Sequence, residues 1–210
     1  MLYRAMQYLC GTTFAMTQTE QKPVIGFSCG DINGIGIEII IKCLSDNRLT
    51  DFCTPVVFAS NKVINFYRKA LPDYNFSFQA IRDLERLAPK TVNVCNCWDE
   101  EVTITPGQLT PEGGKYAIAS LSTAVKALQD KKIDALVTAP FHKKNVYSDL
   151  FPYTGHTPFL KAAFEVKDAA MLMVSENMRV ALLTEHVPLA EAAKYVTREN
   201  ILSKLRIINQ

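Results

Sequence analysis

The stretch PVIGFSCGDINGIGIEIIIKCLSD, residues 23–46, places an apolar run, a glycine-rich turn and a second apolar run one after another. The first run, 23–29, is rich in residues that favour β-strands. The last run, 37–46, carries its apolar residues on one face of a helix. The stretch therefore predicts a strand, a tight turn and a helix, which is the repeating unit of α/β proteins.

Strands and helices continue to alternate along the rest of the chain. The predicted strands are 54–60, 91–97 and 133–139, the predicted helices are 61–71, 111–132, 189–196 and 197–208, and 170–175 with 178–184 form a predicted hairpin. Asn61 is the predicted N-cap of the helix that it begins. This alternation predicts an α/β fold with a mostly parallel sheet flanked by helices, and the hairpin predicts that the sheet is mixed.

The organisation into domains is predicted from changes in sequence character. A chain of 210 residues is long enough for one large domain or two small ones. We expect residues 16–139 to form an N-terminal α/β domain and 140–210 to begin a second, because a predicted strand gives way to a polar loop near Pro140. Met16 begins a polar lead into the first strand, so residues 1–15 are expected to be a tail or an upstream artefact.

The composition excludes several classes of partner. The chain is 48% hydrophobic and 21% charged, with a net charge of +2 and no basic run interleaved with aromatic residues, so we expect no nucleic-acid partner. It has no run of about 18 apolar residues, so we expect no membrane span. Its six cysteines form no C-x-x-C pair and have no zinc-ligand spacing with a histidine, which indicates free thiols in a reducing cytoplasm.

The last predicted helix has an apolar stripe that needs a surface to pack against. The stripe consists of Ile201, Leu202, Leu205, Ile207 and Ile208. It runs to the end of the chain without the glycine or proline that usually stops a helix. We therefore expect the polypeptide to be truncated.

The glycine-rich turn is the first candidate site. Gly30, Gly34 and Gly36 have the spacing G-x-x-x-G-x-G, which fits neither the dinucleotide fingerprint nor the P-loop. Glycines before a helix allow an anion to approach free N–H groups, but a plain tight turn explains them equally well. Asp31 within the turn is either an N-cap, a polar site residue or an exposed side chain.

The second candidate region spans ALVTAPFHKKNV, residues 135–146, and FPYTGHTPFL, residues 151–160. His142 and Lys143 follow a strand, where α/β proteins bind ligands; Lys143 suits a phosphate or carboxylate, although a solvated basic loop is the alternative. His156 and Thr157 can hold a polar substrate. In a second reading, Thr157 is a helix N-cap with Pro158 at the first helical position.

His186 follows the predicted strand 178–184 and precedes a proline. A neutral imidazole at a strand end is a good metal ligand, although a lone histidine is more often structural. The three histidines of the chain lie on three loops and can in principle form one metal site. Their spacing leaves this open.

These segments, in this order, resemble the 4-hydroxythreonine-4-phosphate dehydrogenase family of vitamin B6 biosynthesis. The stretches that carry the resemblance are GDINGIGIE, GQLTPEGGKYA, LVTAPFHKKNV, YTGHTPFL and MRVALLTEHVPL, which together span about residues 23 to 200. The resemblance implies a fold like that of isocitrate and isopropylmalate dehydrogenases, with two α/β domains, a cleft and a homodimer. It also implies that the chain lacks the C-terminal third of the family, so its two domains are incompletely represented.

The activity that the resemblance implies is NAD-dependent oxidation of 4-phosphohydroxy-L-threonine, followed by decarboxylation to 3-amino-2-oxopropyl phosphate. A divalent metal (Zn, Mg or Co) on the substrate hydroxyl would lower the pKa of that hydroxyl and ease hydride loss. Related readings are a dehydrogenase of phosphorylated threonate or erythronate, a diol dehydrogenase, a catalytically incompetent fragment or a generic phosphate-binding module.

Individual roles also follow from the resemblance. His156 and Thr157 match substrate-binding residues, and His186 matches one of three histidine metal ligands. Lys143 and His142 are expected to line the same cleft. The family segments with the other two metal histidines have no match, and neither a catalytic nor a NAD-binding residue is assigned. We therefore expect this chain by itself to be catalytically incompetent.

Overall fold

The computed structural model describes residues 22–149 and 151–209, which divide into one unit up to residue 160 and a second from 161 to 209. The predicted tail, residues 1–15, lies outside the described part. The predicted domain boundary at residues 139 and 140 stays a prediction. Within the residues described, no helix is both long enough and apolar enough to cross a membrane.

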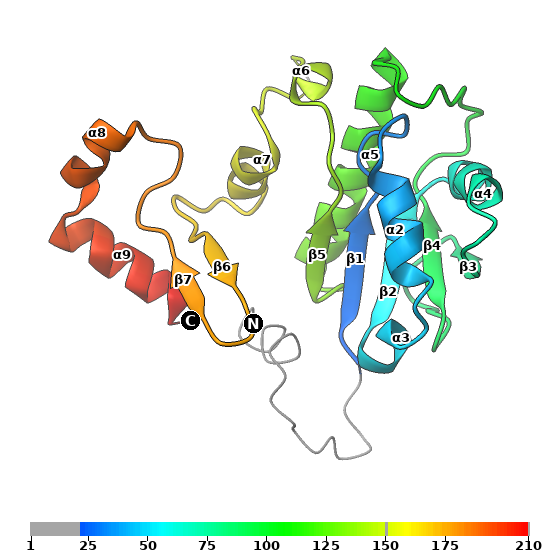
Figure 1. Cartoon of the computed structure of the whole chain (residues 1–210), viewed down its shortest axis with the longest axis horizontal. Helices are drawn as coiled ribbons and strands as arrows, with labels where there is room; N and C mark the ends of the chain where they lie inside the picture. The colour runs from blue at the N-terminus through cyan, green and yellow to red at the C-terminus, as the bar shows by residue number, and fades with distance from the viewer. Residues whose placement is uncertain (1–21, 150, 210) are drawn as a thin grey trace. The chain divides into compact units, whose positions relative to one another are not determined.

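A five-stranded parallel sheet forms the centre of the first unit, in the order β3-β4-β2-β1-β5 (Figure 1). Its strands are β1 (Val24–Ser28), β2 (Thr54–Ala59), β3 (Phe78–Ile81), β4 (Val92–Asn96) and β5 (Ala135–Thr138). All four pairings between neighbouring strands are parallel. The α/β fold with a mostly parallel sheet is confirmed, and β3 at the edge is an additional strand that the sequence did not predict.

Helices cover both faces of this sheet. The first unit contains α2 (Gly36–Leu44), α3 (Leu49–Phe52), α4 (Asn61–Ala70), α5 (Pro111–Gln129) and α6 (Lys143–Val146), and α7 (His156–Ala163) begins at its end. Buried residues of α2 and α4 cluster with Val57, whereas Ala124 of α5 clusters with Val56 and Phe58. Because successive side chains of a strand point to opposite faces, α2 and α4 cover one face and α5 covers the other.

The helix starts show how local sequence fixes the element boundaries. α4 begins at Asn61, and the hydroxyl of Ser60 accepts a hydrogen bond from the Lys62 N–H at 3.3 Å. Ser60 is therefore the N-cap, and the prediction of Asn61 was wrong by one residue. Serine and asparagine side chains are both good N-caps, so the sequence does not distinguish these two neighbouring positions. Thr110 caps α5, and Pro111 occupies its first helical position.

The second unit consists of a hairpin and short helices. Its elements are β6 (Leu172–Val174), β7 (Arg179–Ala181), α8 (Leu189–Ala192), a 3-10 turn (Ala193–Tyr195) and α9 (Arg198–Ile208). The predicted hairpin is present, but it forms its own antiparallel two-stranded sheet and does not extend the five-stranded one. None of the described residues 161–209 is buried, and the stripe on α9 remains largely exposed.

Candidate active site

The carboxyl ends of β1 and β5 meet at one edge of the parallel sheet, and the loops that follow them hold most of the predicted site residues. The two strands pair directly, up to Ser28 opposite Thr138. Open α/β sheets bind their ligands outside this edge. The candidate site is therefore built mainly from the loops 29–35 and 139–142 and from the chain that follows β5.

The glycine-rich loop after β1 packs directly on the backbone that follows β5. The Asp31 N–H donates to the Pro140 carbonyl oxygen at 3.1 Å. Gly30 has a φ of +67°, and a Cβ at this position would collide with the same carbonyl. A Cβ at Gly36 would lie 2.6 Å from the Cys29 carbonyl oxygen. Glycine is thus required for close packing as well as for the turn.

Asp31 is buried beside the first turn of α5. Its Oδ1 accepts a hydrogen bond from the Asn33 N–H at 2.9 Å, and a Cβ at Gly113 would lie 2.5 Å from that oxygen. The N-terminus of a helix favours a negative charge. Because α2 begins at Gly36 after Ile35, Asp31 is not its N-cap. Asp31 is also buried, so it is not an exposed side chain either, and its role as a polar site residue stays a prediction.

Asn33 joins the loop to two other segments. Its Nδ2 donates to Thr110 Oγ1 at 3.0 Å, and its Oδ1 accepts from the Thr105 N–H at 2.8 Å. Its backbone carbonyl accepts from the Gly107 N–H at 2.8 Å. The glycine-rich loop, the segment that precedes α5 and the start of α5 are therefore held in one arrangement.

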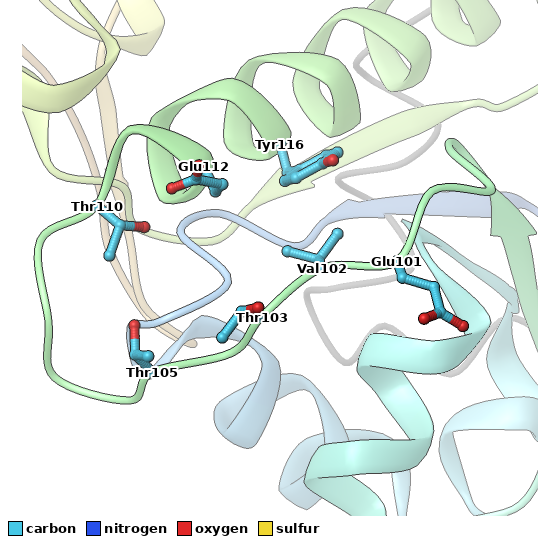
Figure 2. Close-up of a pocket in the computed structure, with 7 residues that line it drawn as sticks. All are labelled: Glu101, Val102, Thr103, Thr105, Thr110, Glu112 and Tyr116. Carbon is cyan, nitrogen blue, oxygen red and sulfur yellow. The ribbon is translucent and has the colours of Figure 1, made fainter.

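A cavity of about 340 Å³ lies beside these joined segments (Figure 2). The residues that line it are Glu101, Val102, Thr103, Thr105, Thr110, Glu112 and Tyr116. The lining combines hydroxyls and carboxylates with apolar surface in similar measure, which suits a ligand that has both kinds of group. Thr110, Glu112 and Tyr116 lie in the stretch GQLTPEGGKYA, but the sequence did not predict the cavity, because it forms only when the 101–105 segment folds against α5.

His156 is the most strongly constrained of the predicted site residues. Its ring stacks on Phe141, with the ring centroids 4.0 Å apart and the planes inclined by 27°. The Nε2 atom is buried and has no hydrogen-bond partner within residues 22–149 and 151–209. The loop after β5 thus fixes the imidazole that opens α7.

Lys143 lies beside His156, as expected from the sequence. A Cβ at Gly155 would lie 3.6 Å from Lys143 Cε and 4.0 Å from its Nζ, so the lysine side chain passes over the glycine. Burial and then the positive charge of Lys143 lower the pKa of His156, and the nearby backbone of Ala139 opposes them only in part. At neutral pH the imidazole is therefore uncharged, while the lysine offers a cation to an anionic group.

His142 and Thr157 occupy exposed positions next to this pair. His142 precedes the first residue of α6 and makes no side-chain cap bond. Thr157 is the second residue of α7, because the helix begins at His156. The reading of Thr157 as an N-cap was therefore wrong, and its hydroxyl is open to other partners.

His186 lies in the second unit. The strand predicted to reach residue 184 ends at Ala181, so His186 does not follow it directly. His186 is exposed and has a φ of +56°, which is uncommon for a residue with a side chain. In the described part of the chain, no three His, Cys, Asp or Glu residues gather in a way that could hold a metal. The residues described thus do not complete a metal centre, and the role of His186 stays a prediction.

Comparison with known proteins identifies the family. The family model described as pyridoxal phosphate biosynthetic protein PdxA matches residues 51–210. The chain belongs to the PdxA family. The resemblance to 4-hydroxythreonine-4-phosphate dehydrogenases is confirmed, and so is the isocitrate dehydrogenase-like α/β fold that PdxA proteins share.

Individual PdxA relatives and structures support this assignment. A 4-hydroxythreonine-4-phosphate dehydrogenase from Bacteroides thetaiotaomicron is 35% identical over 192 residues, which cover 91% of this chain and 52% of the relative. One from Sulfurihydrogenibium is 31% identical, covering 89% and 56%. The crystal structure of one from Burkholderia phymatum matches with a TM-score of 0.78 and 25% identity, covering 89% and 57%. The chain spans about half the length of the curated relatives that it matches.

Proposed function

We propose that this protein is a 4-hydroxythreonine-4-phosphate dehydrogenase of pyridoxal phosphate biosynthesis. The observation that carries the proposal is the pair formed by Lys143 and His156 at the carboxyl edge of a PdxA-family sheet. A cation beside a neutral hydrogen-bonding imidazole suits a substrate that has both anionic groups and hydroxyls. The names of the relatives support an oxidoreductase acting on such a substrate.

The proposed reaction oxidises the secondary hydroxyl of 4-phosphohydroxy-L-threonine with NAD. Bound NAD would accept the hydride of the carbinol carbon while the hydroxyl proton is released, and the resulting β-keto acid would lose CO₂ and take up a proton to give 3-amino-2-oxopropyl phosphate. A bound divalent metal (Zn, Mg or Co) would supply Lewis-acid polarisation of the hydroxyl. We propose His186 as one of its ligands. The described residues do not complete this metal centre.

The residues on this chain would bind and orient the substrate. We propose that His156 and Thr157 contact it directly, while Lys143 attracts its phosphate or carboxylate. The rigid loop held by Gly30 and Asn33 keeps the adjacent edge of the sheet in a fixed shape. We further propose a homodimer, as the family resemblance implies. We also propose that it is cytoplasmic, because of its free thiols, and that its second domain begins at the polar loop near residue 140.

The test is to measure substrate binding and NADH formation on the 210-residue protein. Calorimetry with 4-phosphohydroxy-L-threonine is expected to show binding, weakened in Thr157→Ala and Lys143→Gln. NADH formation, measured with each of the three metals, tests the oxidation itself. Turnover would support the whole reaction on this chain, whereas substrate binding without turnover would fit the predicted incompetence of the chain by itself. Preference for the amine-free 4-phospho acid would instead indicate the related threonate or erythronate enzymes. Absence of binding to either compound would contradict the proposal.

A further inference from the structure

The cavity beside the start of α5 has a polar end that is held in shape by Asn33. This residue is only 3% exposed, and both ends of its side-chain amide are engaged. Its Oδ1 accepts from the backbone N–H of Thr105 at 2.8 Å, and its Nδ2 donates to Thr110 Oγ1 at 3.0 Å. A backbone N–H can only donate, so the amide cannot turn over without losing a bond. Asn33 therefore fixes two threonines of the cavity wall.

The segment that carries Thr105 is a tight turn with little freedom of its own. The Gln108 N–H donates to the Thr105 carbonyl oxygen at 3.0 Å, and Gly107 has a φ of +79°. Pro106 and Gly107 occupy the two central positions, as is typical of a type II turn. The Gly107 N–H also donates to the Asn33 carbonyl oxygen at 2.8 Å. The polar end of the cavity thus has its shape before a ligand binds.

The hydroxyls of both threonines have hydrogen-bonding capacity left over. Thr110 Oγ1 accepts from Asn33 Nδ2 at 3.0 Å and from the Gly113 N–H at 3.2 Å, which uses both lone pairs and leaves its proton to donate. Thr105 Oγ1 is buried and has no hydrogen-bond partner within residues 22–149 and 151–209. A buried polar atom without a partner is costly until a bound molecule supplies the missing bond. The polar end is therefore suited to a ligand that carries hydroxyl groups.

The charges at the cavity select against an anion. The described residues that line it include two glutamates and no lysine, arginine or histidine. Glu101 pairs with Lys62 at 3.1 Å, and its carboxylate points away from the other labelled side chains in Figure 2. Glu112 lies in the first turn of α5, where the helix N-terminus offsets part of its charge. Glu112 can therefore accept hydrogen bonds from a neutral or cationic ligand, whereas it would repel a phosphate or carboxylate.

The other end of the cavity is apolar. Val102 and Tyr116 lie there in Figure 2, and Val102 packs against the buried cluster that includes Tyr116. The Tyr116 hydroxyl is 3.2 Å from Glu100 Oε2 and donates to it, so its proton is engaged. The Tyr116 ring stacks on Trp98 with the centroids 4.6 Å apart. The cavity thus suits a small molecule that is hydroxylated at one end and apolar at the other.

We infer that this cavity binds a nucleoside group, with the ribose hydroxyls at Thr105, Thr110 and Glu112 and the base at Val102 and Tyr116. Carboxylates accept hydrogen bonds from ribose hydroxyls in other α/β proteins, and every base has a flat face that can lie against apolar side chains. The nucleoside class follows from the cavity alone. Its source is either a free nucleoside or the nucleoside part of NAD, and only the second rests on the function proposed above.

Nucleosides that lack a phosphate test this class directly. Adenosine and nicotinamide riboside are titrated into the 210-residue protein by calorimetry, each beside its 2′-deoxy analogue. We expect at least one of the two nucleosides to bind, its 2′-deoxy analogue to bind about tenfold more weakly, and inorganic phosphate not to compete. Absence of binding by both nucleosides, equal binding of the deoxy analogue, or competition by phosphate would overturn the inference.

Two glutamate variants provide a matched comparison, because both side chains line the cavity and only one is free of an ion pair with Lys62. Glu112→Gln is expected to weaken nucleoside binding about tenfold, whereas Glu101→Gln leaves it unchanged. Equal effects of the two substitutions, or no effect of Glu112→Gln, would refute the assigned contact.

Thr105→Val separates binding from stability. The substitution removes a hydroxyl that has no partner in the described chain, so the midpoint of thermal unfolding should not fall. Nucleoside binding is expected to weaken all the same. A lower midpoint with unchanged binding would mean that the hydroxyl has a structural role only.

NAD distinguishes the two sources of the nucleoside. Displacement of the bound nucleoside by NAD, with Glu112→Gln weakening both, would mean that the cavity holds part of the cofactor. A nucleoside that binds and is not displaced by NAD would mean that the ligand is a free nucleoside, and either result supports the site. The proposed function fails separately: if 4-phosphohydroxy-L-threonine does not bind while a nucleoside does, the substrate is wrong and the cavity assignment stands.

Discussion

The two units of the molecule use similar apolar patterns with very different results. In the first unit, apolar residues of β2 such as Val57 and Phe58 are 0% exposed, because helices cover both faces of the sheet. In the second, Leu205 on the stripe of α9 is 54% exposed, and no residue described between 161 and 209 is buried. Each fully buried large apolar side chain contributes about 1.5–3 kcal/mol. The difference shows that an amphipathic pattern specifies a helix, whereas stability requires a surface to cover it.

Substituting one apolar residue in each unit gives the largest expected effect. Phe58→Ala removes a ring packed between α5 and the sheet and is expected to lower the free energy of unfolding by about 3–5 kcal/mol. Leu205→Ala, in the exposed stripe, is expected to change it by less than about 0.5 kcal/mol. Chemical denaturation of both variants measures the contrast. Equal losses would mean that the α9 stripe is covered in solution.

The close packing of the first unit extends to the glycine-rich loop 29–35. Alanine substitutions at two glycines of positive φ, one inside this loop and one outside it, test that packing. Gly30→Ala combines a φ of +67° with a collision against the Pro140 carbonyl, so we expect a loss of about 2–3 kcal/mol. Gly107 has a φ of +79° and nothing within 4 Å of its Cβ position, so Gly107→Ala costs only the strain, about 1 kcal/mol. Similar denaturation midpoints for the two variants would argue against close packing at Gly30.

Each unit has a helix that is capped by a threonine, so the stabilisation from one capping hydrogen bond can be compared between the units. Thr110 and Thr197 each accept a bond from the backbone N–H three residues later, at 3.2 Å. Thr110 also accepts from Asn33 at 3.0 Å. Thr110→Ala is expected to destabilise the first unit by about 1–2 kcal/mol, and Thr197→Ala to cost at most about 1 kcal/mol. Denaturation measures the first loss and helical circular dichroism the second; a larger effect at Thr197 would reverse the ranking of the units.

The smallest expected effect is electrostatic and confined to the first unit. Lys143→Gln removes the charge beside His156, so the pKa of the imidazole should rise towards its ordinary value near 6.5, whereas Lys144→Gln leaves it unchanged. NMR titration measures both.

The lowered pKa of His156 also makes the stability of the folded protein depend on pH. Because the folded-state pKa is lowered, the unfolded chain binds more protons between the folded and the ordinary pKa. The contribution of His156 to the free energy of unfolding is therefore fully present above about pH 6.5. It is lost as the pH falls from there through the lowered pKa of the folded state. Lys143→Gln should weaken this dependence, and an unaltered pH profile would contradict the assigned cause.

The sequence predicts the elements of the first unit well because their signals are local. The apolar runs of β1, β2, β4 and β5 are short and bounded by turns, and the stripe of α5 is regular. β3 was not predicted because it is a four-residue edge strand with two exposed side chains, so its apolar pattern is weak. The separate sheet of the hairpin could not be predicted, since strand pairing depends on residues distant in sequence.

The candidate site was also predicted only as far as local sequence signals reach. The sequence predicts that Lys143 and His156 share a site, and the structure brings them together. It does not identify Phe141 as the partner of the imidazole, because a phenylalanine in a loop resembles any other apolar residue. The only local signal for Phe141 is its place in APFHK, next to His142. The His156 ring that it contacts lies 15 positions further along the chain.

The strand order of the sheet also governs how the chain can fold during synthesis. β1 is made first, yet its neighbour β5 follows it by 110 residues, from Ile25 to Ala135. Until the ribosome has released residues 135–138, one side of β1 exposes unpaired backbone groups, and unpaired strand edges promote aggregation. The loop that packs on Pro140 is likewise incomplete until then. The edge of the sheet that carries the candidate site is therefore among the last parts of the first unit to form.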